Sequence, residues 1–366
     1  MGKKIITFLL PGGSRNPVGG YKIVYEYANR LIKDNYEVNI IYPATLLWKE
    51  QNIYQKLKGI VRYFYFKVNK NRYLPYNWFP LDKKIKIFWT PTLEEKYIPK
   101  SDYVIATACQ TSEYLNKYKN TNIKKFYLIQ GYETWSYSEE KLLKTWKYPL
   151  NKIVVSKWLK EIAINLNEEA ELIYNGLDFE KFYIESEIEK RKNKNIIFLY
   201  HEGEIKGTKY AIEALKELKI RDNEIRIRSF GAYKNPKNLP SWIEYYYSPS
   251  QSKLRELYNE ASIFLGTSLG EGWGLTVAEA MQCGCAVVCT NVVGYNEMAF
   301  DGETALLCES KNSKDMVEKI EKLIENTDLR IRIAKNGNKF IQLFTWEKAY
   351  NSFKFLIDTN SFSNKR

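Results

Sequence analysis

Apolar runs and helical periodicity alternate along the chain from its first residues. Residues 4–10 form a short apolar run that predicts a buried strand, and a glycine-containing loop follows at residues 11–20. Apolar positions then recur at helical spacing over residues 21–34, and residues 37–42 predict a second strand. Further strands are predicted at residues 103–108, 125–129 and 152–155. The order strand, loop, helix and strand is typical of a parallel α/β domain.

A second series of the same kind follows a charge-rich stretch. Residues 181–195 contain few apolar side chains and are interpreted as an interdomain linker. Beyond them, strands are predicted at residues 196–200, 224–230, 243–247, 263–267, 286–290 and 305–308. Helices are predicted at residues 209–218, 250–260, 275–282, 295–300 and 313–326. A chain of 366 residues suits two domains. We therefore expect two doubly wound domains that face a common cleft, with ligands at the carboxyl ends of the strands.

Charge is distributed unevenly between the two halves. Residues 1–160 contain 28 Lys and Arg against 12 Asp and Glu, whereas residues 161–366 contain 28 against 31. The net charge of +13 therefore resides in the first half. Such a basic half predicts an anionic ligand or surface. Nucleic acid is disfavoured, because no RNP-like or zinc-finger pattern accompanies the charge.

Cysteine and histidine usage excludes several chemistries. The chain contains one His and five Cys, and no two Cys have the spacing of a zinc knuckle. We therefore expect neither a metal site nor a Ser-His-Asp triad. The first apolar run is too short for the core of a signal peptide, and no run of about 18 apolar residues occurs. These observations predict a cytoplasmic protein with buried, reduced thiols.

The segment with the most informative chemistry is residues 268–281, SLGEGWGLTVAEAM. It follows a predicted buried strand and opens a helix, with Gly272 and Gly274 at the helix start. Backbone N–H groups lack partners there, and small residues let a phosphate approach them. The carboxylates of Glu271 and Glu279, eight positions apart, could both accept hydrogen bonds from one sugar ligand. The alternative is that Glu271 only caps the helix and Glu279 lies on a solvated face.

This segment resembles the E-x7-E signature of the retaining glycosyltransferases of family GT4, which have the two-domain GT-B fold. The resemblance extends to residues 174–182, Lys206-Gly207, 281–288, 293–297, 301–307 and 344–346, and in the first half to Gly19-Gly20 and residues 155–157. It implies two Rossmann-like domains. Residues 1–180 would form the acceptor-side domain and residues 181–345 the nucleotide-sugar domain. Residues 346–366 would form a helix returning to the first domain, and a tail.

The resemblance implies a role for each matching residue, with the nucleotide sugar as a co-substrate and with neither cofactor nor metal. Glu279 would hold the ribose hydroxyls and Glu271 the hydroxyls of the transferred sugar. Lys206 would neutralise the donor diphosphate and stabilise the leaving nucleoside diphosphate. Gly20 would bring a backbone donor to the same diphosphate from the first domain. Donor-binding positions at the helix start are Gly272, Trp273, Gly274, Leu275 and Thr276.

Two positions depart from the family's pattern. Where the family often has Arg, this chain has His201, which donates to phosphate only weakly unless it is protonated. An ordinary polar loop residue is the alternative there. Where the family commonly has His after a central strand of the first domain, this chain has Gln130, a neutral group that could line the site. Glu133 is a candidate base on the acceptor side. Readout of the base is expected near residues 230–231 and 248–250.

Aromatic and basic side chains alternate closely in residues 48–90. Between residues 54 and 68 a helical register predicts one apolar face. Its members are Leu57, Ile60, Val61, Phe64 and Val68. A cationic amphipathic helix of this kind suits a membrane interface. We hypothesise peripheral docking on an anionic inner leaflet, near a lipid-linked acceptor. The alternative is an ordinary helix that covers the sheet of the first domain.

The function predicted from these patterns is a metal-independent glycosyltransferase of hexosyltransferase type. It would transfer a sugar from a nucleotide-sugar donor to a glycan or lipid-linked acceptor in polysaccharide or glycoconjugate synthesis. A nucleotide-sugar epimerase or a glycoside phosphorylase on the same fold is one alternative. Another is a non-catalytic subunit that only binds a nucleotide sugar. The presence of Glu271, Glu279 and Lys206 argues against that last alternative.

Overall fold

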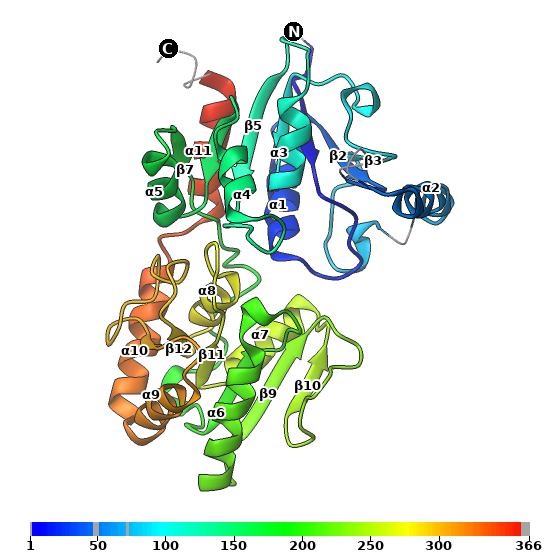
Figure 1. Ribbon diagram of the computed structural model, residues 1–366. Helices are drawn as coiled ribbons and strands as arrows, with labels where there is room; N and C mark the ends of the chain where they lie inside the picture. Colours follow the sequence, from blue (N-terminus) through cyan, green and yellow to red (C-terminus); the bar gives the residue numbers. More distant parts are fainter. Residues whose placement is uncertain (1, 47–50, 71–72, 360–366) are drawn as a thin grey trace. The chain divides into compact units, whose positions relative to one another are not determined.

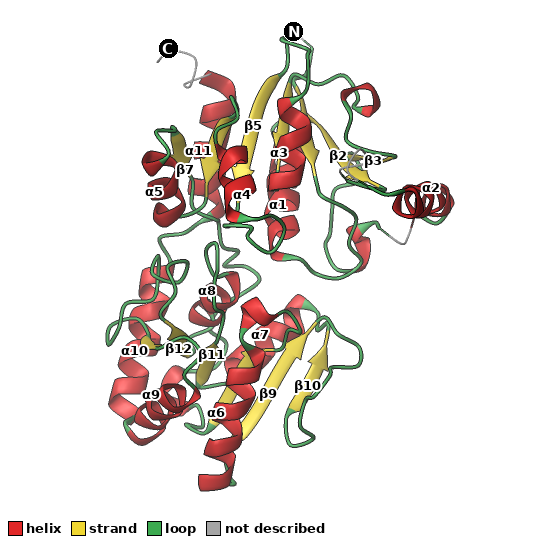
Figure 2. Ribbon diagram, in the orientation of Figure 1, coloured by secondary structure: helices red, strands yellow, loops and turns green. Residues whose placement is uncertain are grey.

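The computed structural model describes residues 2–46, 51–70 and 73–359, and the chain divides into two compact units. Unit 1 comprises Met1–Tyr174 with Ala349–Arg366, and unit 2 comprises Asn175–Lys348. Each unit contains one parallel sheet with helices packed on it (Figures 1 and 2). The α/β expectation is therefore confirmed, while the common cleft stays a prediction. Trp48, Lys49 and Arg72, which belong to the basic aromatic stretch, lie outside the described residues.

The sheet of unit 1 has the strand order β3-β2-β1-β4-β5-β6-β7. Its strands are β1 Ile5–Leu9, β2 Glu37–Pro43, β3 Lys86–Thr90, β4 Tyr103–Ala106, β5 Lys124–Ile129, β6 Asn151–Val154 and β7 Ala170–Leu172. Chain order reverses between β1 and β4, which makes this pair the topological switch point of the sheet. Both strands that the sequence prediction omitted, β3 and β7, lie at the edges.

The helices of unit 1 include one from the far end of the chain. They are α1 Gly19–Lys33, α2 Ile53–Val68, α3 Cys109–Asn116, α4 Glu139–Trp146, α5 Lys157–Asn165 and α11 Trp346–Thr359, with the short 3-10 turns η3 Pro75–Asn77 and η4 Glu95–Tyr97. The ring of Phe353 on α11 lies 6.5 Å from that of Phe8 and 4.4 Å from that of Tyr27. Lys354 pairs with Asp34 at 3.0 Å. The predicted return of the C-terminal helix to the first domain is therefore confirmed.

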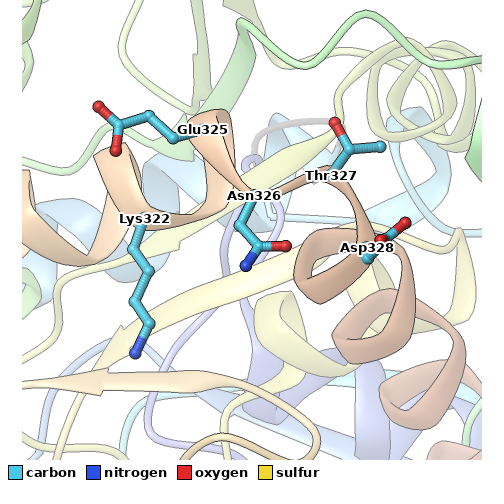
Figure 3. Close-up of a pocket in the computed structure, with 5 residues that line it drawn as sticks. All are labelled: Lys322, Glu325, Asn326, Thr327 and Asp328. Atoms are coloured by element: carbon cyan, nitrogen blue, oxygen red, sulfur yellow. The ribbon is translucent and has the colours of Figure 1, made fainter.

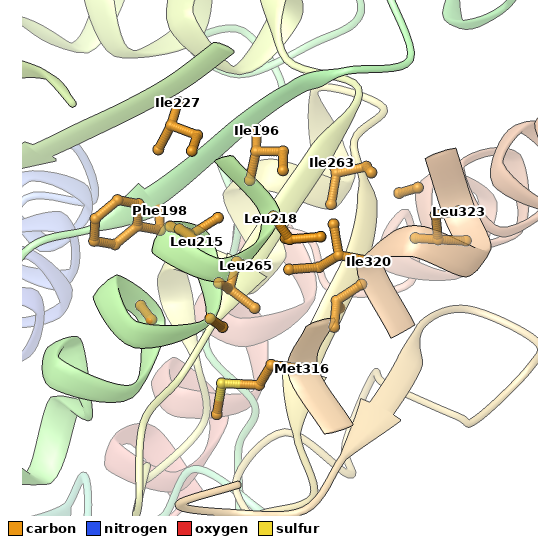
Figure 4. Packing of buried hydrophobic residues seen from close by; sticks show 14 of the residues in the cluster. Ile196, Phe198, Leu215, Leu218, Ile227, Ile263, Leu265, Met316, Ile320 and Leu323 are labelled. Carbon is orange, nitrogen blue, oxygen red and sulfur yellow. The ribbon is translucent and has the colours of Figure 1, made fainter. Parts of the chain in front are cut away.

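The sheet of unit 2 has the order β10-β9-β8-β11-β12-β13. Its strands are β8 Asn195–Leu199, β9 Arg226–Gly231, β10 Glu244–Tyr247, β11 Ile263–Gly266, β12 Ala286–Thr290 and β13 Leu306–Cys308. Its helices are α6 Thr208–Arg221, α7 Gln251–Glu260, α8 Leu275–Gln282, α9 Ser313–Glu325 and α10 Thr327–Ile341, with the 3-10 turns η5 Ile188–Lys190 and η6 Glu204–Lys206. Side chains of β8 and β11, such as Phe198 and Leu265, pack with Leu218 of α6 and Ile320 of α9 (Figure 4). This core fixes the strand ends from which the loops of unit 2 emerge.

Two predictions for unit 2 are wrong. The predicted linker, residues 181–195, is a folded part of the unit, because Ile188 enters the core and buried Arg191 donates to the carbonyls of Ala261 and Cys283. The predicted helix at residues 295–300 is a series of turns. There the Thr304 hydroxyl accepts from Phe300 N and donates to a nearby carbonyl, which diverts the backbone from a helical path.

The division between the units falls before the predicted boundary at residue 180. Leu177 N donates to Phe344 O at 2.9 Å, and Leu177 forms a parallel bridge with Thr345. A Cβ on Gly176 would lie 2.5 Å from the Trp346 ring, so only glycine fits against this indole. These contacts attach the segment after Tyr174 to unit 2.

Candidate functional site

The loops after β8 and β11 meet at the carboxyl edge of the unit 2 sheet. Chain order reverses between these two strands, which is where ligands of such sheets bind. Leu269 N donates to Ile205 O at 2.7 Å, and the Thr267 hydroxyl donates to Lys206 O at 3.0 Å. Gly207 has φ +64°, and a Cβ there would lie 1.9 Å from Thr267 O. Hydrogen bonds therefore join the two loops, and only glycine fits at position 207 where they touch.

Lys206 and Glu271 meet across these loops. The Lys206 Nζ lies 2.5 Å from Glu271 Oε1, and the Ser268 hydroxyl donates to the same oxygen at 2.6 Å. Both side chains are only partly buried, Lys206 with 26% of its surface exposed and Glu271 with 14%. The structure thus brings together two predicted site residues that are distant in sequence, and leaves part of the Lys206 side chain exposed.

The N-terminus of α8 lies directly after Glu271. Gly274 precedes the helix with φ +97°, and a Cβ there would lie 2.5 Å from the ring of Tyr295. Within the described residues no side chain caps this helix, and Leu275 and Thr276 are half-buried. The first N–H groups of α8 therefore offer donors and a positive dipole end to an anion. Gly272, which is also half-buried, lies in the turn before them.

The Trp273 side chain packs in the interior, unlike the other predicted donor-binding residues at the start of α8. Its side chain is buried, and its ring lies 5.3 Å from that of Phe344. Only the backbone of Trp273 belongs to the helix start, whereas the indole anchors the motif in the interior of unit 2.

Glu279 is buried inside α8, with 7% of its surface exposed, so the solvated-face alternative is wrong. Burial, and to a lesser extent the Glu279 carboxylate, raises the pKa of Tyr258 on α7. The Tyr258 ring packs on Phe230, at 5.6 Å, near the end of β9. Beside that strand end, Ser248 N donates to Gly231 O at 2.7 Å. Tyr258 therefore packs at the strand ends where base readout is expected.

His201 follows β8 and is neutral at neutral pH. Its Nδ1 accepts a hydrogen bond from Gly203 N at 2.9 Å, which leaves the proton on Nε2. Burial, and then the charge of Lys206, lowers the pKa of His201. His201 Nε2 lies 3.4 Å from the Tyr233 hydroxyl, and a neutral imidazole does not supply the charge of a guanidinium.

The lowered pKa of His201 predicts a pH dependence of stability. The unfolded chain protonates this side chain near pH 6.5, and the folded chain does so at a lower pH. Stability should therefore fall as the pH drops below about 6.5, because the unfolded state then binds more protons. Urea unfolding at pH 7.5 and pH 5.5 checks this against His201→Gln, which removes the only His. We expect the wild type to lose stability relative to the variant at pH 5.5; a pH-independent difference would contradict the assignment.

The candidate residues of unit 1 also lie close together. Gly20 is in the first turn of α1, and a Cβ there would lie 3.3 Å from the side-chain amide of Gln130, which follows β5. Glu133 is buried, and its Oε2 accepts from Cys109 N at 2.8 Å, at the start of α3. Burial raises the pKa of this carboxyl. Glu133 therefore holds the start of α3, and its role as an acceptor-side base stays a prediction.

Two surface hollows of unit 2 are lined by other residues. One of about 470 Å³ lies between α9 and α10. Its lining consists of Lys322, Glu325, Asn326, Thr327 and Asp328 (Figure 3). This hollow lies where α9 ends and α10 begins, and the Asn326 side chain caps α10 by accepting from Leu329 N. In the part of the chain that the structure describes, no three His, Cys, Asp or Glu side chains gather as metal ligands.

Sequence reasoning missed two residues that shape the site. Ser268 orients Glu271, and Thr267 holds the backbone of Lys206. The spacing of Ser268 three positions before Glu271, in a turn after a strand, was the available signal for the first. The second contact joins residues 61 positions apart, which no local pattern indicates.

A known protein family matches the part of the chain that contains the unit 2 candidates. Residues 180–340 match the sequence profile of the family described as Glycosyl transferases group 1. Over these residues the chain is similar to the glycosyl transferases group 1. The matched segment contains His201, Lys206, Glu271 and Glu279, whereas Gln130 and the other unit 1 candidates lie outside it.

Two relatives that the chain resembles in sequence are also named as glycosyltransferases. An uncharacterized glycosyltransferase of Methanocaldococcus jannaschii is 32% identical over 54% of this chain and 56% of its own length. An N,N'-diacetylbacillosaminyl-diphospho-undecaprenol alpha-1,3-N-acetylgalactosaminyltransferase of Campylobacter jejuni is 30% identical over 51% of this chain and 49% of its own. The chain therefore spans about half the length of each of these two relatives.

A solved structure shows the fold over nearly the whole chain. HepE of Anabaena, in complex with UDP-glucose, has a TM-score of 0.70 at 15% identity, over 97% of this chain and 99% of that one. The prediction of a GT-B fold is therefore confirmed.

Proposed function

We propose that this protein transfers a sugar from a nucleotide-sugar donor to a glycan or lipid-linked acceptor, with retention of the anomeric configuration. The observation that carries the proposal is the pairing of Lys206 with Glu271 at the switch point of unit 2, beside the uncapped start of α8. A cation, a carboxylate and free N–H donors are the groups that bind the diphosphate and the hydroxyls of such a donor.

Donor binding would exchange the partner of Lys206. A diphosphate carries more negative charge than one carboxylate and attracts the ammonium group away from Glu271. Glu271 would then accept from hydroxyls of the sugar, in the orientation that Ser268 holds at 2.6 Å. As the bond to the sugar breaks, an oxocarbenium-like centre would form. Lys206 and the N–H groups of α8 would stabilise the charge on the departing phosphate without a divalent metal.

The acceptor side of the proposal rests on the relatives and on the charge of the first half. The name of the Campylobacter jejuni relative contains a diphospho-undecaprenol acceptor, which favours a lipid-linked acceptor here. The excess of basic residues in the first half suits an anionic lipid or diphosphate. We place the protein at the cytoplasmic face of the cell membrane, in polysaccharide or glycoconjugate synthesis, with Gln130 as a residue that lines the site and Glu133 on the acceptor side.

A donor screen tests the proposal directly. Thermal unfolding would be followed with UDP-, GDP-, dTDP- and ADP-sugars, since a ligand that binds only the folded state raises its melting temperature. The stabilising donor is then incubated with and without an acceptor glycan. Product formed from the donor alone would indicate an epimerase, and dependence on inorganic phosphate would indicate a phosphorylase. Stabilisation by none of the nucleotide sugars would overturn the proposal.

Replacing Glu279 by alanine should weaken donor binding by about 1–3 kcal/mol, the scale of a lost buried polar contact. Calorimetric titration of the stabilising donor measures the change in Kd. Glu256→Ala removes an exposed carboxylate from the same unit and serves as the control. Equal donor affinity in the two variants would show that Glu279 does not contact the nucleotide.

A further inference from the structure

The helix α2 exposes its apolar face. Five apolar residues at helical spacing form this docking face. They are Leu57, Ile60, Val61, Phe64 and Val68, with exposed fractions of 57%, 44%, 68%, 60% and 83%. The alternative that this face covers the sheet of unit 1 is therefore wrong. An exposed contiguous apolar surface of this kind indicates an interaction site.

The opposite side of α2 attaches the helix to unit 1. Figure 1 shows α2 beside β3, at the edge of the sheet. Gly59 is buried on this side, Trp89 Nε1 donates to Tyr63 O at 3.0 Å, and the Phe66 ring lies 5.1 Å from that of Trp89. Because these contacts fix the rotation of the helix, the docking face points away from the sheet.

The start of α2 is defined by a capping box. Gln55 N donates to the Asn52 side chain at 2.9 Å, and Asn52 N donates to the Gln55 side chain at 3.1 Å. The docking face therefore belongs to a preformed helix with a definite beginning. A preformed amphipathic helix does not have to order its backbone when it binds a surface.

Charge decides which surface fits the docking face. Residues 53–70 contain five basic side chains and no acidic one. Lys58 follows Leu57 and Lys67 precedes Val68, so at about 100° per residue these lysines border the face on opposite sides. Lysines in such positions extend to lipid headgroups while apolar neighbours enter the acyl region. A second copy of the chain would bring the same positive charge against itself.

We propose that α2 docks this protein on an anionic lipid surface, with the docking face in the boundary between headgroups and acyl chains and the flanking lysines on lipid phosphates. The association is peripheral: among the described residues, no helix is long and apolar enough to span a bilayer. The proposal does not depend on the donor site, which lies in unit 2.

Vesicle flotation tests the docking face. The full chain should float with vesicles of phosphatidylglycerol and phosphatidylcholine at low salt, and less with phosphatidylcholine alone. Val61→Glu with Phe64→Glu should lower the bound fraction at least about tenfold, since two apolar side chains no longer enter the lipid. The matched control is Ile220→Glu with Phe355→Glu, which changes residues exposed at 76% and 60% elsewhere by the same charge. This control should float like the wild type.

Four further measurements test the proposal. Circular dichroism and donor-induced thermal stabilisation should be unchanged in the Val61 and Phe64 double variant, because both positions are exposed and lie outside unit 2. Lys58→Gln with Lys67→Gln should reduce binding to anionic vesicles and its salt dependence. Equal flotation of both double glutamate variants would overturn the proposal. So would light scattering that shows a wild-type dimer which the Val61 and Phe64 substitutions dissociate.

Discussion

Replacing Lys206 by alanine is expected to slow sugar transfer 100-fold or more. Lys206 Nζ is a side-chain cation at the switch point of unit 2, where the departing diphosphate would gain negative charge. Loss of one preorganised donor to a developing oxyanion costs about 100- to 1000-fold in rate. The variant also leaves Glu271 without its ionic partner, and its uncompensated charge would oppose the donor's phosphates. Both effects act in the same direction.

Initial rates of transfer at saturating donor measure this effect. Lys209→Ala is the matched control, because Lys209 is an exposed lysine three residues away and its loss changes the net charge equally. We expect Lys209→Ala to retain nearly full activity. Lys206→Arg should recover part of the rate, since it restores the cation with a different shape. Equal rates for Lys206→Ala and Lys209→Ala would exclude Lys206 from the reaction.

Replacing Gly207 by alanine should destabilise unit 2 by about 2–4 kcal/mol, from the strain of a left-handed residue together with steric overlap. The added Cβ would lie 1.9 Å from the carbonyl oxygen of Thr267, so the loops after β8 and β11 must separate. Their separation would break the bonds from Leu269 N to Ile205 O and from Thr267 to Lys206 O. Lys206 would then lose its position, and transfer should fall together with stability.

Gly302→Ala separates the two causes of this effect. Gly302 also has a left-handed backbone, with φ +72°, but no atom lies within 4 Å of an added Cβ. Its substitution should therefore cost only the backbone strain, about 1–2 kcal/mol. Urea unfolding of both variants gives the comparison. A loss of stability in Gly207→Ala no greater than that in Gly302→Ala would show that the loop contact is unimportant.

Local patterns allowed much of unit 2 to be predicted. The helix at residues 275–282 has its predicted bounds, because a glycine with a left-handed backbone fixes its start and Gly284 follows its end. The pairing of Glu271 with Lys206 depends on β8 and β11 lying side by side in the sheet, which no local pattern indicates. Residues 181–195 were misjudged because burial of Arg191 depends on carbonyls that only the folded chain brings to it.

The orientation of α2 was the least predictable feature of unit 1. Its periodicity correctly indicated one apolar face, but periodicity does not say which face a sheet will take. The Phe66 ring packs against Trp89, and Trp89 Nε1 donates to the Tyr63 carbonyl, so these groups rather than the exposed apolar stripe make the internal contact. Tertiary packing of β3, itself an edge strand that the pattern did not reveal, decided the outcome.

The packing of Phe353 against Phe8 and Tyr27 has a consequence for how the newly translated chain folds. A ribosome releases the first 174 residues long before α11, yet that helix supplies fully buried side chains to their core. The first 174 residues of unit 1 therefore stay incompletely packed while the whole of unit 2 is translated. Unit 1 can complete its core only after α11 has been translated. A stop codon just before α11 should therefore leave unit 1 prone to aggregation and proteolysis.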